Sequence, residues 1–280
     1  MIKLSILIPS YNYKKGLKLI LSDFCSCNKS ELNLIEIIVG DDSDRNLLSP
    51  EEVNIYKKYI PNFYYLFNIN NLYINNWNNL ISIAKGDYYW LFHHDEKLNN
   101  PNKSLKKIIN TLNKKYEIII LPVYKIKTIK FRNIKFNFIE RHSPYKEFIK
   151  YFIRNNIYLL YINIIGPPTA LIISKNRKYF YENDLTWFVD VLYYYRVFER
   201  SEISKIKFFL EKDVFISSNQ NFKNSITKKN KKNLNKFNKL KNNEEKKIKL
   251  KTSKDIRKLN LFILWTLFKI YRILHIKIKI

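Results

Sequence analysis

Short apolar runs alternate with stretches of helical periodicity through the N-terminal part of the chain. A nearly continuous apolar run is typical of a strand covered on both faces, and apolar residues three and four positions apart indicate one buried face of a helix. From these patterns we expect strands at residues 4–8, 35–40, 63–67, 88–92 and 117–121, and helices at residues 14–25, 74–84 and 105–112. The alternation predicts an α/β fold with a mostly parallel, doubly wound sheet flanked by helices.

The pattern is less regular beyond Pro122. A hairpin is expected at residues 123–138, helices at 147–153 and 187–198, and a strand at 170–173. Lys and Asn dominate residues 223–251, and apolar residues return at Leu259. We therefore expect a main domain over residues 1–222, a Lys/Asn-rich linker or helical segment over 223–258, and an apolar and basic C-terminal helix over 259–280.

The charge balance adds a candidate partner. Lys and Arg number 51 against 24 Asp and Glu, which gives a formal net charge of +27 and favours a polyanion or an anionic membrane surface. The abundance of Lys, Asn and Ile has an alternative explanation in AT-rich codons, and both readings stay open. With 46% hydrophobic and 16% aromatic residues, the composition excludes a disordered chain.

The cysteines and the apolar runs indicate a cytoplasmic protein. Cys25 and Cys27 are spaced poorly for a disulfide, and they are the only cysteines. We find neither a secretory signal nor an uninterrupted apolar stretch of the roughly 18 residues that a membrane span needs. The expected location is cytoplasmic, with peripheral association at the inner face of the cell membrane as a further candidate.

Acidic side chains follow two of the predicted strands. Asp41 and Asp42 come after residues 35–40, and a His-His-Asp-Glu cluster that contains Asp95 comes after residues 88–92. The carboxyl ends of strands in an open parallel sheet are where ligands bind, and a divalent cation takes carboxylate and phosphate oxygens together. For Asp41 and Asp42 a helix cap or an Asx turn is the alternative. Zinc is the alternative for the second cluster, although adjacent residues of a strand point to opposite faces.

Taken in order, the motifs resemble those of the family 2 glycosyltransferases with the GT-A fold. The resemblance is carried by residues 5–12 (SILIPSYN), residues 38–44 (IVGDDSD) and residues 75–95, which end on Asp95. It is thinner over residues 166–200, where GPPTA and Phe188-Val189-Asp190 match the acceptor half. The resemblance implies a GT-A catalytic domain with a Rossmann-like, mostly parallel sheet and a C-terminal helical appendage.

The resemblance also implies an activity and a set of site residues. The enzyme would move a sugar from a nucleotide-diphosphate donor to a glycan or lipid-linked acceptor in surface polysaccharide synthesis, with inversion and with a divalent cation, Mn²⁺ or Mg²⁺. Asp95 would bind the cation and Asp190 would be the general base. No nucleic acid is expected as a partner. The nucleotide pocket would be lined by Pro9, Tyr11, Asn12, Asp41, Asp42 and His93.

The sequence departs from the family pattern at three places. His93 stands where the metal signature has its first Asp, and Val189 replaces the Glu that usually precedes the base. We find no late His after the base helix, where Asn219 or Gln220 is the nearest polar residue. These departures keep a degenerate, non-catalytic relative as one alternative. The net charge keeps a basic RNA- or polyanion-binding protein as another.

The basic residues of the C-terminal segment suggest how it could meet a membrane. Lys269, Arg272, His275 and Lys279 recur at helical spacing and would form one basic stripe of an interfacial helix on anionic lipid. A helix on the catalytic domain, with this stripe in water, is the alternative. The period-two alternation of residues 275–280 also fits a strand. For Asp190 the alternatives to catalysis are a surface carboxylate or an ion pair with Arg196.

Overall fold

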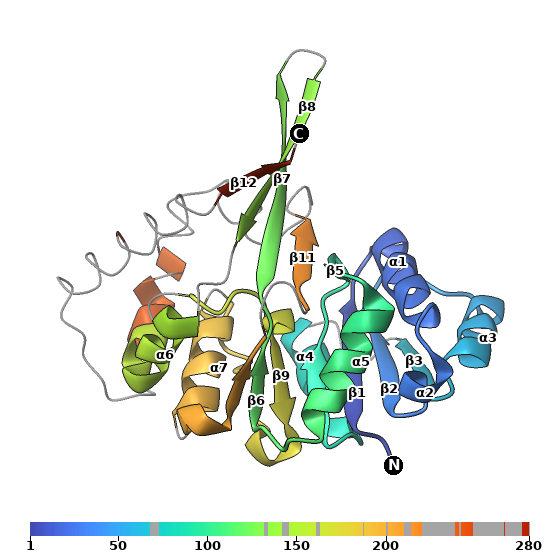
Figure 1. Ribbon diagram of the computed structural model, residues 1–280, viewed down its shortest axis with the longest axis horizontal. Coiled ribbons are helices and arrows are strands. Elements are labelled where there is room, and N and C mark those ends of the chain that lie inside the picture. The colour runs from blue at the N-terminus through green and yellow to red at the C-terminus, as the bar shows by residue number, and fades with distance from the viewer. Residues whose placement is uncertain are drawn as a thin grey trace. The chain divides into compact units, whose positions relative to one another are not determined.

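The chain forms two compact units that interleave along the sequence (Figure 1). Unit 1 contains Met1–Val123, Pro167–Tyr181 and Ser201–Ser218, and unit 2 contains Tyr124–Gly166, Glu182–Arg200 and Asn219–Ile280. The computed structural model describes residues 1–67, 73–131, 134–141, 146–160, 163–186, 188–199, 201–209, 214–219, 239–240, 242–248, 266 and 276–279.

Unit 1 is built on a seven-stranded sheet with the order β10-β6-β9-β4-β1-β2-β3. Its strands are β1 (Leu4–Ser10), β2 (Ile35–Asp41), β3 (Phe63–Phe67), β4 (Tyr88–Leu91), β6 (Ile118–Ile120), β9 (Leu171–Ser174) and β10 (Ile206–Phe208). The strand pairs are parallel except those of β9, which runs antiparallel to β4 and β6. The mostly parallel sheet predicted from the sequence is confirmed, and β9 is the exception within it.

Helices flank this sheet (Figure 1). They are α1 (Lys14–Cys25), α2 (Lys29–Leu32), α3 (Pro50–Tyr59), α4 (Tyr73–Ile83) and α5 (Pro101–Leu112), with short 3₁₀ turns η2 (Pro168–Ala170), η3 (Lys175–Arg177) and η4 (Ile203–Lys205). The sequence patterns did not predict α3, because this helix buries none of its residues and so lacks an apolar face. A short antiparallel pair of β5 (Glu96–Leu98) and β11 (Ile216–Asn219) completes the unit.

Aromatic packing under the end of β4 fixes the loop that follows it. Trp90 and Phe92 are buried, and Phe92 makes edge contacts with Trp90 (4.9 Å between ring centroids) and Phe24 of α1 (5.8 Å). The Trp90 indole N–H donates to the Thr169 carbonyl at 2.8 Å. Each such buried aromatic contributes about 1.5–3 kcal/mol of transfer free energy. The position of residues 93–95 is therefore set by the core.

Unit 2 contains the predicted hairpin, which is confirmed as β7 (Val123–Phe131) and β8 (Ile134–Arg141). A short strand, β12 (Ile276–Lys279), pairs antiparallel with β8. The helical elements of this unit are α6 (Lys146–Arg154), η1 (Asn156–Leu160) and α7 (Val189–Phe198). Both helices contact η1.

The predictions for residues 223–280 can be compared with the structure at only a few described residues. The prediction of a helix is wrong at residues 276–279. These residues form β12, in agreement with the period-two alternation of the sequence. Within the predicted Lys/Asn-rich segment, residues 239–240 and 242–248 are helical. Apart from Thr266 and β12, the predicted C-terminal helix lies outside the described residues. In the described part of the chain, every helix is too short or too polar to cross a membrane.

Candidate active site

Asn12 ties together the loops that follow β1 and β2. Its backbone N–H donates to Ser43 Oγ (2.7 Å), while its side-chain amide donates to Asp44 Oδ2 (2.9 Å) and accepts from the Asp44 N–H (3.2 Å). Asn12 has a φ of 48°, in the left-handed region that Asn tolerates better than most residues. The two loops therefore lie together at the carboxyl edge of the sheet, where open α/β sheets bind ligands.

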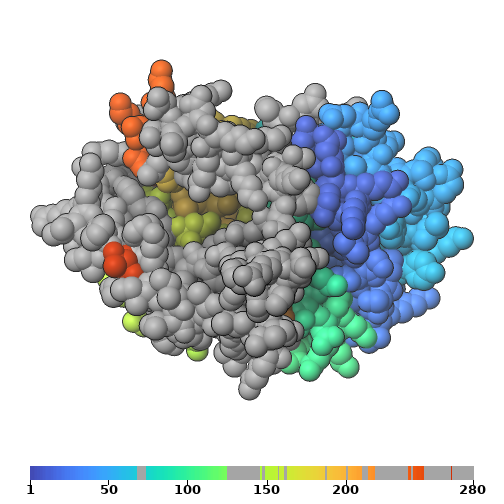
Figure 2. Space-filling view, turned by 90° about the horizontal axis from the view of Figure 1, so that it is seen from above, coloured from blue at the N-terminus to red at the C-terminus, as the bar shows by residue number. Residues whose placement is uncertain are grey.

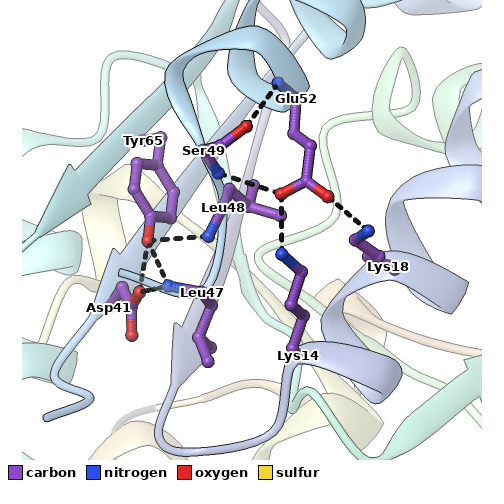
Figure 3. A network of polar contacts seen from close by, with 8 residues as sticks. All are labelled: Lys14, Lys18, Asp41, Leu47, Leu48, Ser49, Glu52 and Tyr65. Carbon is purple, nitrogen blue, oxygen red and sulfur yellow. Dashed lines mark hydrogen bonds and ion pairs between the residues drawn. The ribbon is translucent and has the colours of Figure 1, made fainter. Parts of the chain in front are cut away.

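The carboxylate of Asp41 is the centre of a buried network at the end of β2 (Figure 3). It is fully buried and accepts hydrogen bonds from the Ser43 N–H (3.0 Å), the Leu47 N–H (2.8 Å) and the Tyr65 hydroxyl. The Tyr65 oxygen also accepts from the N–H groups of Leu47 (2.9 Å) and Leu48 (3.3 Å). Burial, reinforced by the Asp41 carboxylate, raises the pKa of Tyr65, so its hydroxyl stays a donor. Asp41 thus orders the loop of residues 42–48.

Asp42, which follows Asp41 in the chain, lies slightly closer to solvent than Asp41. Its side chain is 8% exposed against 0% for Asp41, and its backbone N–H donates to the Ser10 carbonyl at 3.0 Å. Ser10 ends β1 directly beside Asp41 in the strand register. Among the described residues, the buried Ser10 hydroxyl has no hydrogen-bond partner. Buried polar atoms of this kind are usually satisfied, so the edge between β1 and β2 is suited to a polar ligand.

Glu52 fixes the far end of the same loop (Figure 3). Its carboxylate accepts from the Ser49 N–H (2.9 Å) and its own N–H donates to Ser49 Oγ (3.3 Å), which is a capping box at the start of α3. The carboxylate also forms ion pairs with Lys14 (2.9 Å) and Lys18 of α1. Burial opposes ionisation of Glu52, but these hydrogen bonds outweigh it and lower its pKa to about 2. Helices α1 and α3 contact each other. Residues of this N-terminal part of the chain are coloured blue in Figure 2.

The loop after β4 is held against the end of β1. His94 Nδ1 donates to the Pro9 carbonyl at 3.0 Å, which fixes the tautomer with a proton on Nδ1. Gly16 of α1 permits this close approach, since a Cβ there would lie 2.3 Å from the His94 carbonyl oxygen and 2.0 Å from the Tyr13 ring. The ends of β1, β2 and β4 are thereby brought together within unit 1.

His93 is a neutral side chain in this loop. Its backbone N–H donates to Thr169 Oγ1 (3.1 Å), and its ring packs on Trp77 with 5.1 Å between centroids. Burial lowers the pKa of His93 to about 4, although Asp95 partly opposes the shift. Its buried Nε2 has no hydrogen-bond partner among the described residues. A neutral imidazole with an unused polar atom suits a ligand hydrogen bond.

Asp95 is the acid of the loop that is available for a cation. It is half-buried, in the turn between β4 and β5. No three His, Cys, Asp or Glu side chains of the described residues lie together as a metal cage, so a zinc site made entirely of protein ligands does not fit. Mg²⁺ usually keeps several waters and binds through one or two carboxylates together with substrate phosphates. Asp95 fits that arrangement.

Asp190 lies in unit 2, in the first turn of α7. Burial raises the pKa of its carboxyl to about 7, and its buried Oδ1 has no hydrogen-bond partner in the described part of the chain. Arg196, the partner considered as an alternative, forms its ion pair with Glu182. An unpartnered carboxyl with a pKa near neutrality has the properties of a general base.

Several residues that build the site were missed in the sequence. The roles of Tyr65 and Thr169 gave no signal, although Thr169 lies in the GPPTA motif, because each acts through a contact with a residue far away in the chain. Of the two polar residues nearest to the place of the missing late His, Asn219 ends β11, and Gln220 lies outside the described residues. Six predicted site residues lie at or near the carboxyl ends of β1, β2 and β4: Pro9, Asn12, Asp41, Asp42, His93 and Asp95, with the exposed Tyr11 beside Asn12.

Comparison with solved structures gives the fold. TarS of S. aureus, residues 1–349, aligns with a TM-score of 0.55 and 16% identity over 78% of this chain and 60% of that chain. The same fragment in complex with UDP-GlcNAc aligns with a TM-score of 0.58 and 16% identity over 79% of this chain and 59% of that chain. The chain thus spans less than two thirds of the TarS chains. A comparison with curated proteins gave no match.

The profile of "Glycosyl transferase family 2" matches residues 5–180, which is more than half of the chain. The matched region contains β1 to β4 and the loops that carry the predicted nucleotide and metal residues. Together with the fold, this match confirms the GT-A architecture and the family predicted from the sequence motifs. The chain belongs to glycosyl transferase family 2.

Proposed function

We propose that this glycosyltransferase moves a sugar from a nucleoside diphosphate donor to a hydroxyl group of a glycan or lipid-linked acceptor, with inversion at the anomeric carbon. One observation carries the proposal: the ends of β1, β2 and β4 converge on a polar edge that contains Asp42, His93 and Asp95. TarS, which shares the fold, is described in complex with UDP-GlcNAc and with UDP. This supports a uridine-type donor.

Each polar group of the edge has a proposed role. Asp42 accepts hydrogen bonds from the base or ribose, Tyr11 and Pro9 line the pocket, and His93 donates or accepts one neutral hydrogen bond. Asn12 and Asp41 hold the loops in place. Asp95 would hold Mn²⁺ or Mg²⁺, and such a cation would neutralise the charge that develops on the leaving group.

Asp190 takes the proton from the acceptor hydroxyl. The acceptor oxygen then bonds to the anomeric carbon while the bond from that carbon to the phosphate oxygen breaks, and the nucleoside diphosphate leaves. A base is most efficient when its pKa lies near the operating pH. The raised pKa of Asp190, about 7, meets that condition.

Membrane association is part of the proposal for the acceptor. A lipid-linked acceptor would be reached from an anionic membrane surface, to which the net charge of +27 is attracted. The segment expected to make this contact, residues 259–280, lies mostly outside the described residues.

Thermal unfolding with UDP or UDP-GlcNAc, with and without Mn²⁺, tests the donor site. Ligands that bind only the folded state raise its stability, so we expect a higher Tm with UDP and a further rise with Mn²⁺. In Asp95→Asn, the further rise in Tm caused by Mn²⁺ should be absent. Asp87→Asn is the control, because it removes the same charge from an exposed position at the other end of β4. A wild-type protein that ignores nucleotide sugars but is stabilised by RNA would overturn the proposal.

A further inference from the structure

The helix that carries Asp190 has no cap of its own. Its N-cap residue is Phe188, whose side chain cannot accept a hydrogen bond, so the helix start lacks the usual Ser, Thr, Asp or Asn cap. The first N–H groups of a helix need acceptors from elsewhere when they are buried. Phe188 is 7% exposed, so its N–H cannot rely on bulk water.

Glu244 supplies an acceptor for the N-cap N–H and for one N–H just before it. Its carboxylate accepts from the Thr186 N–H through Oε1 (2.7 Å) and from the Phe188 N–H through Oε2 (3.0 Å). The side chain of Glu244 is 2% exposed, so both bonds are sheltered from water. A carboxylate at a helix N-terminus also complements the helix dipole. Both partners belong to unit 2.

A second residue from the same segment holds the same loop. Lys247 Nζ donates to the Asp184 carbonyl at 2.8 Å and lies 3.5 Å from the Asp184 carboxylate. Glu244 and Lys247 are three residues apart in the helical residues 242–248. Together they attach this short helix to Asp184, Thr186 and Phe188, immediately before α7.

This attachment changes the interpretation of the Lys/Asn-rich segment. Glu244 and Glu245 are the only acidic residues between Lys223 and Lys251. Glu244 is buried and bonded, whereas Glu245 is exposed. A solvated linker would have no reason to bury one of its two carboxylates, because burying a charge is costly unless it is hydrogen-bonded.

We propose that Glu244 and Lys247 are positioning residues for catalysis, which set the start of α7 and with it the place of Asp190. Asp190 lies two residues after Phe188, so a change in the backbone at Phe188 is passed directly to the base. The role of Asp190 as base rests on the proposed function, whereas the attachment of the loop does not. Glu244 and Lys247 thus act on the base through the backbone that precedes α7.

The test compares Glu244→Gln with Glu245→Gln. Both remove one charge from the same helix. Glu244→Gln also replaces the acceptor of the Thr186 and Phe188 N–H groups by an amide with a single acceptor oxygen, whereas Glu245 is exposed. Misplacing a catalytic group by about 1 Å costs on the order of 100-fold in rate, so we expect kcat of Glu244→Gln to fall about 10- to 100-fold. The donor KM should change by less than about twofold, since Glu244 bonds the segment before α7 in unit 2, whereas the predicted donor residues belong to unit 1. Glu245→Gln should keep both parameters.

Hydrogen exchange of a peptide covering residues 184–190 provides a readout that does not depend on activity. Exchange should be faster in Glu244→Gln and, to a smaller extent, in Lys247→Met, and unchanged in Glu245→Gln. If Glu244→Gln does not fold, the decision rests on Lys247→Met, for which a lower kcat with normal donor KM is expected. Equal kcat and equal exchange in Lys247→Met, Glu245→Gln and wild type would overturn the inference. If the wild-type protein transfers no sugar, while exchange is still faster in Glu244→Gln than in wild type, the proposed function is refuted and the attachment of the loop is not.

Discussion

Asn78 holds Tyr181 by both backbone polar groups of that residue. The Asn78 amide donates to the Tyr181 carbonyl at 2.8 Å and accepts from the Tyr181 N–H at 2.8 Å. The Tyr181 ring meets Trp77 edge-on, with 4.9 Å between centroids, and Trp77 packs on His93. The segment after η3 is thereby connected, through α4, to the loop that carries Asp95.

Asn78→Ala should destabilise the protein by about 1–3 kcal/mol, because it leaves the N–H and carbonyl of a 4% exposed residue without their partner. The free energy of unfolding in urea measures the change. Asn79→Ala is the control on the next position of α4, where the side chain is half-buried. Equal loss in both variants would show that Asn78 acts only through helix propensity.

Tyr65→Phe should weaken donor binding while leaving kcat at saturating donor nearly unchanged. The variant removes one donor from Asp41 and the only acceptor seen for the Leu48 N–H in the described residues, so the loop with Asp42 becomes less ordered. Loss of such bonds corresponds to a rise of about 3- to 10-fold in the donor Kd. Tyr64→Phe removes an equivalent hydroxyl from the neighbouring, exposed position of β3 and serves as control. A Tyr65→Phe protein with wild-type donor affinity would remove the loop from the nucleotide site.

Glu52 makes stability depend on pH in acid. Its pKa is about 2 in the folded state against an ordinary value of 4.5, so the folded state releases this proton more readily than the unfolded chain. The contribution is therefore complete above about pH 4.5 and is lost as the pH falls toward 2. Because Lys14 and Lys18 are nearly half exposed, solvent screens the two ion pairs. The contribution of Glu52 to the free energy of unfolding is therefore limited to about 1 kcal/mol.

Glu52→Gln should flatten the fall in unfolding free energy between pH 4.5 and 2, measured by urea denaturation at a series of pH values. Glu51→Gln is the control, because it removes a charge from the same turn of α3 without touching the ion pairs with Lys14 and Lys18. If both variants follow the wild-type curve, the two ion pairs do not stabilise the fold.

The strands and the place of the site followed from local patterns. β1 and β2 are buried along their whole length, so their apolar runs were visible in the sequence. Parallel pairing of β1 with β2 then brings Ser10 beside Asp41 and puts the acids at one edge. The direction of β9 could not be predicted, because an apolar run has the same pattern whichever way the strand runs. For α3 the available signals were the capping box at Ser49 and Glu52 and the proline at its first position, Pro50.

Individual roles within the site depend on contacts that spacing does not show. Asp41 and Asp42 are indistinguishable in the sequence, yet Asp41 is enclosed by donors that include Tyr65, 24 residues away. Glu244 accepts a hydrogen bond from the Thr186 N–H, although the two residues are 58 positions apart and the composition around Glu244 indicates a linker. Its neighbour Glu245 has the same local context and remains exposed. Burial separates Glu244 from Glu245, and burial is a property of the fold.

The carboxyl of Asp190 should limit both the rate and the stability in a pH-dependent way. As base it must be ionised, so kcat/KM of wild type should rise with pH through about 7, and Asp190→Asn should lose about 10²- to 10⁴-fold in kcat. Donor affinity should stay near that of wild type. Glu199→Gln, at the other end of α7, is the charge-matched control.

The stability of the same variant gives an independent test. Burial raises the pKa of Asp190 from 3.8 to about 7, so between these values the folded protein keeps a proton that the unfolded chain releases. This group therefore makes folding less favourable as the pH rises from about 4 to 7, and the penalty is complete above 7. Asp190→Asn removes the penalty, so its unfolding free energy relative to wild type should increase over this range, in parallel with the loss of activity. Such a gain in stability with loss of turnover is expected of a buried base kept for function. An Asp190→Asn protein that is destabilised equally at pH 5 and pH 8 would show instead that the carboxylate is satisfied in the folded state and holds the helix in place.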